Sequence, residues 1–222
     1  MIKFQAEERP LRPKASMSLH LGHILAFFSG LWRKRARRIA SPGGRTHRAM
    51  MDPTVNRQAC FTSILAAGGV RQFSARGEHP RVTQLLLDAV RVLPGGLGIA
   101  IVELGESPRE WVGTGVSRGE LLEAILALRD LLGHGALDLA VFSSSEGVEI
   151  YLDRGGLLEI RASSSWEPRA RSLLEAQHFV WAPRLPDAWS PSPINPAARD
   201  RIAAVAEFLA LRIAPAPYRA RN

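Results

Sequence analysis

The five residues from Gly115 to Gly119 are the part of the sequence that most resembles catalytic machinery. They read Gly-Val-Ser-Arg-Gly, which satisfies the Gly-x-Ser-x-Gly pattern of a nucleophile elbow, a serine at a turn between a strand and a helix. A serine hydroxyl becomes a nucleophile only beside a base, and Asp153 and His178 follow in the order that α/β-hydrolases use. A small serine hydrolase centred on Ser117 is therefore one hypothesis.

The same serine also fits a purely structural role. Glu120 follows Ser117 by three residues, which is the spacing of a capping box at the start of a helix. The chain has 222 residues, so 222 minus 117 leaves 105 after the serine, too few for the remaining strands of a hydrolase sheet. The preceding strand also carries Gly113 and Thr114 in place of a buried apolar run. These residues favour a helix cap, and we expect no catalytic residue.

Residues that bind phosphate or metal ions are present without the spacing that such sites need. No Gly-Lys-Ser or Gly-Lys-Thr occurs, which excludes a P-loop, and Gly113-x-Gly115 has Arg118 where a dinucleotide fingerprint needs a third glycine. The six histidines are scattered, with no His-Glu-x-x-His arrangement. The single cysteine, Cys60, can form neither an internal disulfide nor a cysteine-rich zinc site. We expect no cofactor and no metal ion.

Two glutamates on adjacent predicted strands, Glu149 and Glu159, resemble a general acid and base pair. Arg154 and Arg161 lie close to them in the sequence. Opposite charges that alternate with apolar residues along strands are typical of a solvated sheet face. We interpret the four residues as such a face.

Five tryptophans against two tyrosines are a less ordinary feature of the composition. Most of them stand at the ends of predicted elements or in a proline-rich segment. Aromatic side chains at such places close over a core, or they anchor a protein interface. The candidate residues for binding a partner are Trp111, Trp166, Trp181, Trp189 and Phe179.

The net charge of +8 is distributed unevenly along the chain. Residues 1–78 hold 14 Lys and Arg against 4 Asp and Glu, an excess of +10, whereas residues 79–222 hold 15 against 17, an excess of -2. A DNA-binding domain carries its basic stripe on its own folded elements. We therefore expect no nucleic-acid partner. The apolar content of 46% excludes a wholly disordered chain and allows one domain with a core.

Residues 1–50 are interpreted as a basic leader that is disordered or not translated. Leu19–Trp32 is apolar but about 14 residues long, shorter than the roughly 20 that a membrane-spanning helix needs. Basic residues follow it, from Arg33 to Arg38, whereas a secretory signal has them first. Arg outnumbers Lys 26 to 3, as in a GC-rich coding sequence, and Met50 and Met51 offer later starts. A membrane-surface helix over residues 19–38 is the alternative, although we expect no membrane partner.

The rest of the chain predicts one α+β domain over residues 79–214, after a linker or lead-in at 51–78 and before a tail at 215–222. Apolar residues at helical spacing predict helices over 81–93, 120–132, 167–178 and 195–213. Apolar runs and alternation predict strands over 97–104, 111–116, 137–141, 148–152 and 158–162. This order predicts a single mostly antiparallel sheet of about five strands packed against helices, and not a doubly wound nucleotide-binding fold.

Parts of this order resemble two known families. The meander Leu137–Ala162, a helix with Leu173-Leu174, the following Phe179 and Trp181, and a final helix over Asp200–Ile213 are similar to the type III secretion chaperone and YbjN-like superfamily. That resemblance implies a small noncatalytic module, often dimeric, that binds extended segments of other proteins. Helix, two strands, helix, three strands and helix also resemble the order of roadblock domains, which dimerise and regulate small GTPases.

We therefore predict a noncatalytic protein-interaction module, chaperone-like or regulatory, that binds a segment of another protein. We expect a homodimer and a cytoplasmic location. Binding would use an exposed sheet edge, by strand addition, or a groove between helices. The alternatives are a roadblock-type GTPase regulator, a serine hydrolase centred on Ser117, and a membrane-associated protein held by residues 19–38.

Overall fold

A computed structural model describes residues 59–66, 69–94, 96–103, 109–188 and 195–214. All of them belong to one compact unit, Met50–Pro215. The chain forms β1 (Cys60–Leu65), β2 (Arg71–Arg76), α2 (His79–Val92), β3 (Leu97–Glu103), β4 (Arg109–Val116), α3 (Arg118–Ala127) and α4 (Arg129–Gly133). Then follow β5 (Leu137–Ser143), β6 (Val148–Leu152), β7 (Leu158–Ala162), α5 (Glu167–Ala176), β8 (Val180–Trp181), α6 (Pro196–Phe208) and β9 (Arg212–Ile213).

All strands of the described residues join one sheet, in the order β8-β1-β2-β7-β6-β5-β3-β4-β9. The predicted α+β class is confirmed, but the sheet has nine strands in these residues instead of about five. It is also mixed, because β8 pairs with β1 in the parallel direction while the other neighbours are antiparallel. Two strands, β8 and β9, have only two residues each, too few to show a period in the sequence.

The hairpin of β1 and β2 lies in the stretch that the sequence marked only as a linker or lead-in. Of its twelve strand residues, only Phe61, Phe73 and Ala75 are buried. The hairpin therefore lacks the alternating apolar pattern of a strand with one buried face, by which a strand is predicted from sequence. β2 pairs with β7 and attaches the hairpin to the predicted meander.

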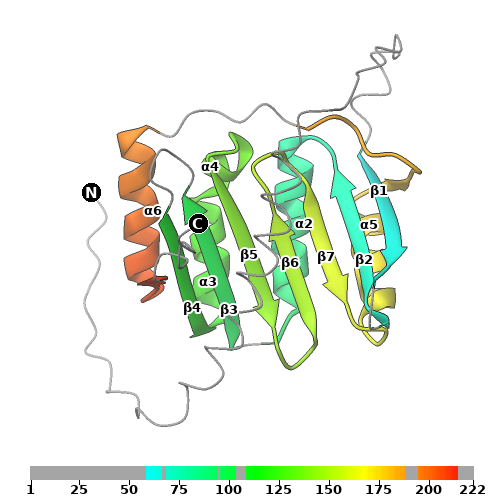
Figure 1. The fold of residues 1–222 in the computed structure, drawn as a ribbon, viewed down its shortest axis with the longest axis horizontal. Helices are drawn as coiled ribbons and strands as arrows, with labels where there is room; N and C mark the ends of the chain where they lie inside the picture. Colours follow the sequence, from blue (N-terminus) through cyan, green and yellow to red (C-terminus); the bar gives the residue numbers. More distant parts are fainter. Residues whose placement is uncertain (1–58, 67–68, 95, 104–108, 189–194, 215–222) are drawn as a thin grey trace, which may run out of the picture. The chain divides into compact units, whose positions relative to one another are not determined.

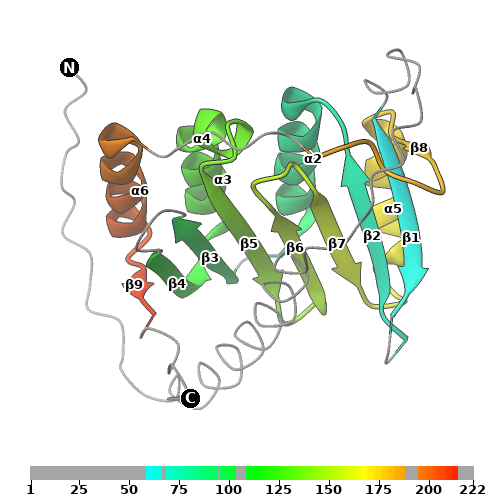
Figure 2. The ribbon, with the colours of Figure 1, turned by 45° about the horizontal axis from the view of Figure 1, so that its top comes forward.

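Helices α2, α3, α4 and α5 cover one face of the sheet, and α6 lies beside β4 (Figures 1 and 2). The predicted strands alternate, so one set of side chains faces these helices and forms the core. That set includes Ile99, Ile101, Leu139, Val141, Ile150 and Ile160. The helix layer hides this face, and Ala100, Val102 and Ala140 on the opposite face are buried as well, so the sheet edges are the candidate surfaces for function.

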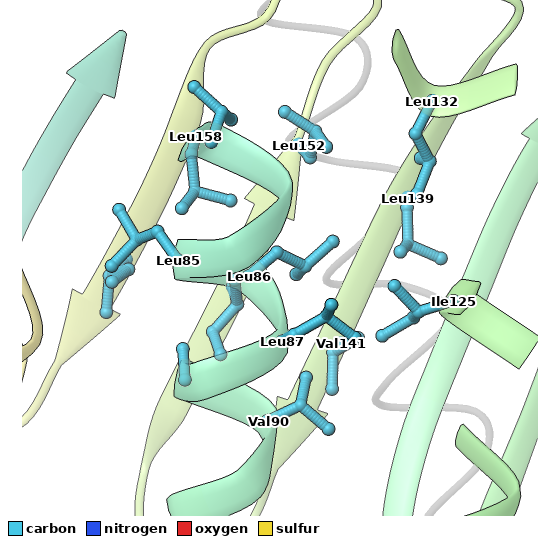
Figure 3. Packing of buried hydrophobic residues seen from close by; sticks show 14 of the residues in the cluster. Leu85, Leu86, Leu87, Val90, Ile125, Leu132, Leu139, Val141, Leu152 and Leu158 are labelled. Carbon is cyan, nitrogen blue, oxygen red and sulfur yellow. The ribbon is translucent and has the colours of Figure 1, made fainter. Parts of the chain in front are cut away.

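Helix α2 is the centre of the helix layer. Leu85, Leu86 and Val90 are fully buried and pack toward β5, β6 and β7 (Figure 3). The helix has a proline in its first turn, at Pro80, where no intrahelical N–H is needed. Shortening one of these leucines to alanine costs about 2–5 kcal/mol in a core of this kind.

Two predicted helices end or break earlier than their apolar spacing indicates. The helix over 120–132 is divided into α3 and α4 at Leu128, whose ψ of 3° departs from helical geometry. The last helix stops at Phe208, because Ala210 takes a positive φ of 52° and turns the chain back. Leu211 then packs over Gly113 of β4, where a Cβ atom would lie 2.5 Å from the leucine Cδ2. This contact places β9 on β4.

Candidate functional site

The outer end of the sheet at β1 and β8 exposes four large apolar side chains. Ile64 and Leu65 of β1 are 55% and 66% exposed, and Val180 and Trp181 of β8 are 49% and 59% exposed. The two strands are hydrogen-bonded neighbours at the same end of the sheet (Figure 2). Ile64 and Val180 lie on one face of the sheet and Leu65 and Trp181 on the other, because successive strand residues alternate, so exposed apolar side chains flank this end of the sheet on both faces.

The backbone of β1 leaves part of this end unpaired within the described residues. Val180 and Ala182 donate N–H hydrogen bonds to the carbonyls of Ala59 (2.9 Å) and Phe61 (2.8 Å). Alternate residues of a strand point their backbone groups to the same side, so those of Ser63 and Leu65 point outward as well. β8 pairs with β1 no further than Phe61. Ser63 and Leu65 therefore present N–H and C=O groups to a further strand.

The sequence of the unpaired stretch carries neither a charged residue nor a proline, two usual protections of an edge strand. From Ala59 to Ala66 the sequence reads Ala-Cys-Phe-Thr-Ser-Ile-Leu-Ala, with no charged residue and no proline. Natural edges are commonly blocked by such residues, because an open uncharged edge pairs with other chains. We call Thr62–Leu65 together with Val180 and Trp181 the β1 edge. Its chemistry suits the addition of a strand.

The five sequence candidates for partner binding are spread over different environments. Trp166 and Phe179 are 2% and 3% exposed and belong to the core, so they offer no surface to a partner. Trp111 is half-buried and packs against the same core. Trp189 lies outside the described residues. Trp181 alone among these five is both described and well exposed, and it lies at the β1 edge.

Sequence reasoning did not single out Ile64, Leu65 and Val180. The signal that was present is a short uncharged run with phenylalanine, threonine and isoleucine, followed by Gly68-Gly69 as a turn. That run indicates a strand, but it does not say that the strand lies at an edge.

At the catalytic candidate Ser117, the structure forms a helix cap. The Glu120 backbone N–H donates to Ser117 Oγ (3.2 Å), and the Ser117 N–H donates to Glu120 Oε2 (3.0 Å). The predicted capping box is confirmed. Asp153 accepts a hydrogen bond from the Leu157 N–H (2.8 Å). His178 follows α5, which lies on the other side of α2 from α3 (Figure 1). The three hydrolase candidates are not brought together.

The two glutamates of the predicted charged face differ in environment. The β6–β7 register sets Glu149 opposite Arg161 and Tyr151 opposite Glu159, so the glutamates are diagonal neighbours. Arg161 Nη1 lies 3.5 Å from Glu149 Oε2. Glu159 is only 6% exposed, so the interpretation of a solvated face is wrong for this residue.

The same face holds a buried carboxylate that the sequence did not single out. Asp138 is 6% exposed and accepts hydrogen bonds from the Tyr151 hydroxyl (2.9 Å) and the Arg154 backbone N–H (2.8 Å). Arg154 thus approaches this face through its backbone. Burial raises the pKa of Asp138 above its usual value, although both hydrogen bonds favour the charged form. Burial also raises the pKa of Glu110 on β4.

Two further kinds of site concern metal ligands and the thiol of Cys60. No group of three or more His, Cys, Asp and Glu side chains lies close enough there to hold a metal ion. Cys60 is partly exposed at the start of β1, and burial raises the pKa of its thiol. The reactive thiolate form is therefore less populated at neutral pH than in a free cysteine.

Among the helices that the structure describes, none combines the length and apolar character needed to cross a bilayer. Residues 19–38, which carry the membrane-surface alternative, lie outside the described ranges.

Comparison of the chain with protein-family models, with curated proteins and with solved structures gives no match. The chaperone-like and roadblock-like resemblances therefore stay predictions from the sequence.

Proposed function

We propose that this protein is a noncatalytic protein-interaction module that binds an extended segment of another polypeptide chain as an added strand on the β1 edge. One observation carries the proposal: the backbone of Ser63 and Leu65 faces outward on an uncharged strand, beside the exposed side chains of Ile64, Val180 and Trp181. In strand addition, main-chain hydrogen bonds supply affinity and the flanking side chains supply specificity.

The chemistry of the β1 edge defines the segment that fits it. The segment must be extended, because only a strand can meet both outward N–H groups and both outward C=O groups. It must also be uncharged where it meets β1, because Thr62–Leu65 offers no charged group to pair with. Full burial of an aliphatic or aromatic side chain contributes about 1.5–3 kcal/mol, so each half-exposed side chain here supplies about half of that.

A cytoplasmic location is part of the proposal. The chain has one cysteine, Cys60, and it is free. A chain without disulfides suits a reducing compartment.

The test places a photo-crosslinking residue at the β1 edge of the full chain. Leu65→benzoylphenylalanine reports on the edge, and Leu126→benzoylphenylalanine on α3, where Leu126 is 50% exposed, is the matched control. We expect an adduct with a second polypeptide from position 65 and none from position 126. Adding Ile64→Lys to the position-65 variant should remove the adduct, because a buried lysine amine would be unpaired against an apolar strand. Equal adducts from both positions, or none from position 65, would overturn the proposal.

A further inference from the structure

We infer that the β1 edge binds the C-terminal end of another polypeptide, as a short antiparallel strand whose carboxylate lies beside Arg184. The inference rests on the proposed function, because it names the kind of segment that the same edge takes. It is argued from the place where β8 ends, from the charge that follows β8, and from the side chains that flank the open stretch.

The end of β8 limits how far an added strand can run. Trp181 pairs with Phe61, so Ala182 stands opposite Thr62, and its N–H donates to the Phe61 carbonyl (2.8 Å). A strand laid along Ser63 is therefore collinear with β8 and meets Ala182 end to end. A chain that continued further would have to occupy the place of Ala182. The segment that fits without displacing β8 is one that ends there.

The segment after β8 turns back toward the start of β1. The Pro186 carbonyl accepts a hydrogen bond from Arg76 Nη1 (2.7 Å), and Arg76 stands opposite Cys60 in the hairpin register. This segment therefore does not run along the second half of β1, where Ile64 and Leu65 stay more than half exposed. The open stretch of β1 has one blocked end, at β8.

The charge at the blocked end selects the direction of the strand. Arg184 lies two residues after Ala182, is exposed, and is the first charged residue after β8, with Asp187 three residues further along. An antiparallel strand brings a C-terminal carboxylate to this end, whereas a parallel strand brings an N-terminal ammonium group, which Arg184 would repel. The long arginine side chain can reach the end of the strand, and its guanidinium binds a carboxylate through two hydrogen bonds. Antiparallel pairing is also slightly more stable per residue.

The backbone of β1 gives the register. The last residue of the segment stands opposite Ser63 and the third-last opposite Leu65, and each of these pairs exchanges two hydrogen bonds. In the first pair, the Ser63 N–H donates to an oxygen of the C-terminal carboxylate. A hydrogen bond to a charged acceptor is about twice as strong as a neutral one, which offsets the shortness of the strand.

The flanking side chains define the last three residues of the segment. Leu65 and Trp181 share one face, so the last side chain lies near Trp181 and the third-last beside Leu65. The second-last side chain lies on the other face, beside Ile64. Apolar side chains at these positions bury part of Trp181, Leu65 and Ile64, which are all more than half exposed. The segment is then uncharged along β1, and its one charge stands at the end beside Arg184.

The first experiment measures the binding of fluorescein-labelled peptides to the full chain by fluorescence anisotropy. The probe is Gly-Ser-Gly-Ser-Leu-Val-Leu with a free C-terminal carboxylate. The same peptide with a C-terminal amide should bind about tenfold more weakly, because it loses the charge-assisted bonds. A peptide with Gly-Ser-Gly added after the last leucine should bind about tenfold more weakly as well, because its chain would run into Ala182.

The second experiment removes the cation in the full chain. Arg184→Ala should weaken binding of the free-acid peptide about tenfold and leave binding of the amide unchanged. Arg129→Ala is the matched control, because Arg129 is an exposed arginine on α4, away from β1 (Figure 1). It removes the same charge and should change the binding of neither peptide.

The third experiment identifies what the β1 edge captures. The adduct from Leu65→benzoylphenylalanine is digested and its cross-linked peptide is sequenced by mass spectrometry. We expect the C-terminal peptide of the captured protein.

Several outcomes would overturn the inference. They are equal binding of the free acid and the amide, binding of neither, an Arg184→Ala variant that weakens both peptides equally, and an adduct whose captured peptide is internal. An internal peptide would keep the proposed function, because a strand would still occupy the edge. No adduct from position 65 at all would overturn both.

Discussion

The Tyr151 hydroxyl donates a 2.9 Å hydrogen bond to Oδ2 of Asp138 and joins strands β6 and β5 on the sheet face opposite the helices. The other carboxylate oxygen accepts the Arg154 N–H (2.8 Å) at the start of the β6–β7 turn. Asp138 is therefore buried with both oxygens bonded, and burial outweighs these bonds and raises its pKa.

The raised pKa of Asp138 predicts a pH dependence of stability. Above the usual value of 3.8 and below the raised value, the native state holds a proton that the unfolded state has lost. The contribution of Asp138 to the free energy of unfolding therefore falls as pH rises through this window. Urea unfolding from pH 4 to 7 should show wild type losing stability relative to Asp138→Asn as pH rises. Asp138→Ala, which loses both accepted bonds, should be less stable than Asp138→Asn by about 1–3 kcal/mol. A difference between wild type and Asp138→Asn that stays constant would contradict this assignment.

Removal of the helix cap at Ser117 should lower the stability of the protein. Ser117→Ala removes the acceptor of the Glu120 N–H and should lower the free energy of unfolding by about 0.5–2 kcal/mol. Ser172→Ala is the control, because the exposed Ser172 hydroxyl donates to the carbonyl of Pro168 within α5, and its removal should be nearly neutral. Chemical denaturation of both variants checks this. A Ser117→Ala variant of unchanged stability that loses a measured hydrolytic activity would favour the serine hydrolase instead.

At the end of α6, replacement of Ala210 by glycine should stabilise the protein. Ala210 has a φ of 52°, a conformation that costs an L-residue about 1 kcal/mol and costs glycine little. Ala210→Gly should therefore raise the free energy of unfolding by about 0.5 kcal/mol after the entropy of glycine is counted. Ala204→Gly, at an exposed position inside the same helix, should lower it by about 1 kcal/mol. Thermal unfolding should shift in opposite directions for the two variants, and shifts in one direction would contradict the prediction.

The ion pairs of Arg199 and Arg201 on α6 should contribute unequally to the free energy of unfolding. Arg199 Nε lies 2.9 Å from Oε1 of Glu103, whose side chain is 4% exposed, whereas Arg201 pairs with Asp130, which is 54% exposed. Arg199→Ala leaves a buried carboxylate without its cation and should cost about 2 kcal/mol or more. Arg201→Ala should cost about 0.5 kcal/mol or less. Adding Glu103→Gln should restore part of the loss in Arg199→Ala and nothing in Arg201→Ala, as urea unfolding can measure. Equal losses of unfolding free energy in Arg199→Ala and Arg201→Ala would contradict the prediction that the buried Glu103 carboxylate needs Arg199 as its cation.

The meander and its helices could be predicted because their burial leaves a repeat in the sequence. β3 is buried at all seven of its positions, and β6 alternates between buried and half-buried positions. The hairpin of β1 and β2 could not be predicted in this way, because it buries one residue of β1 and two of β2. The tryptophans were equally ambiguous, since Trp166 and Trp181 both stand beside helix α5 in the sequence, yet one is core and the other is exposed.

By itself, the sequence determined the fold class, the approximate positions of β3 to β7 and of the helices, and the cap at Ser117, because each leaves a pattern among residues a few positions apart. Only the tertiary structure decided that β1 is near the edge of the sheet, that β8 covers just its first two residues, and that Ile64 and Trp181 belong to one end of the molecule. These facts depend on the pairing of segments more than 100 residues apart, since Cys60 pairs with Val180. A local pattern of side chains does not predict which distant segments pair.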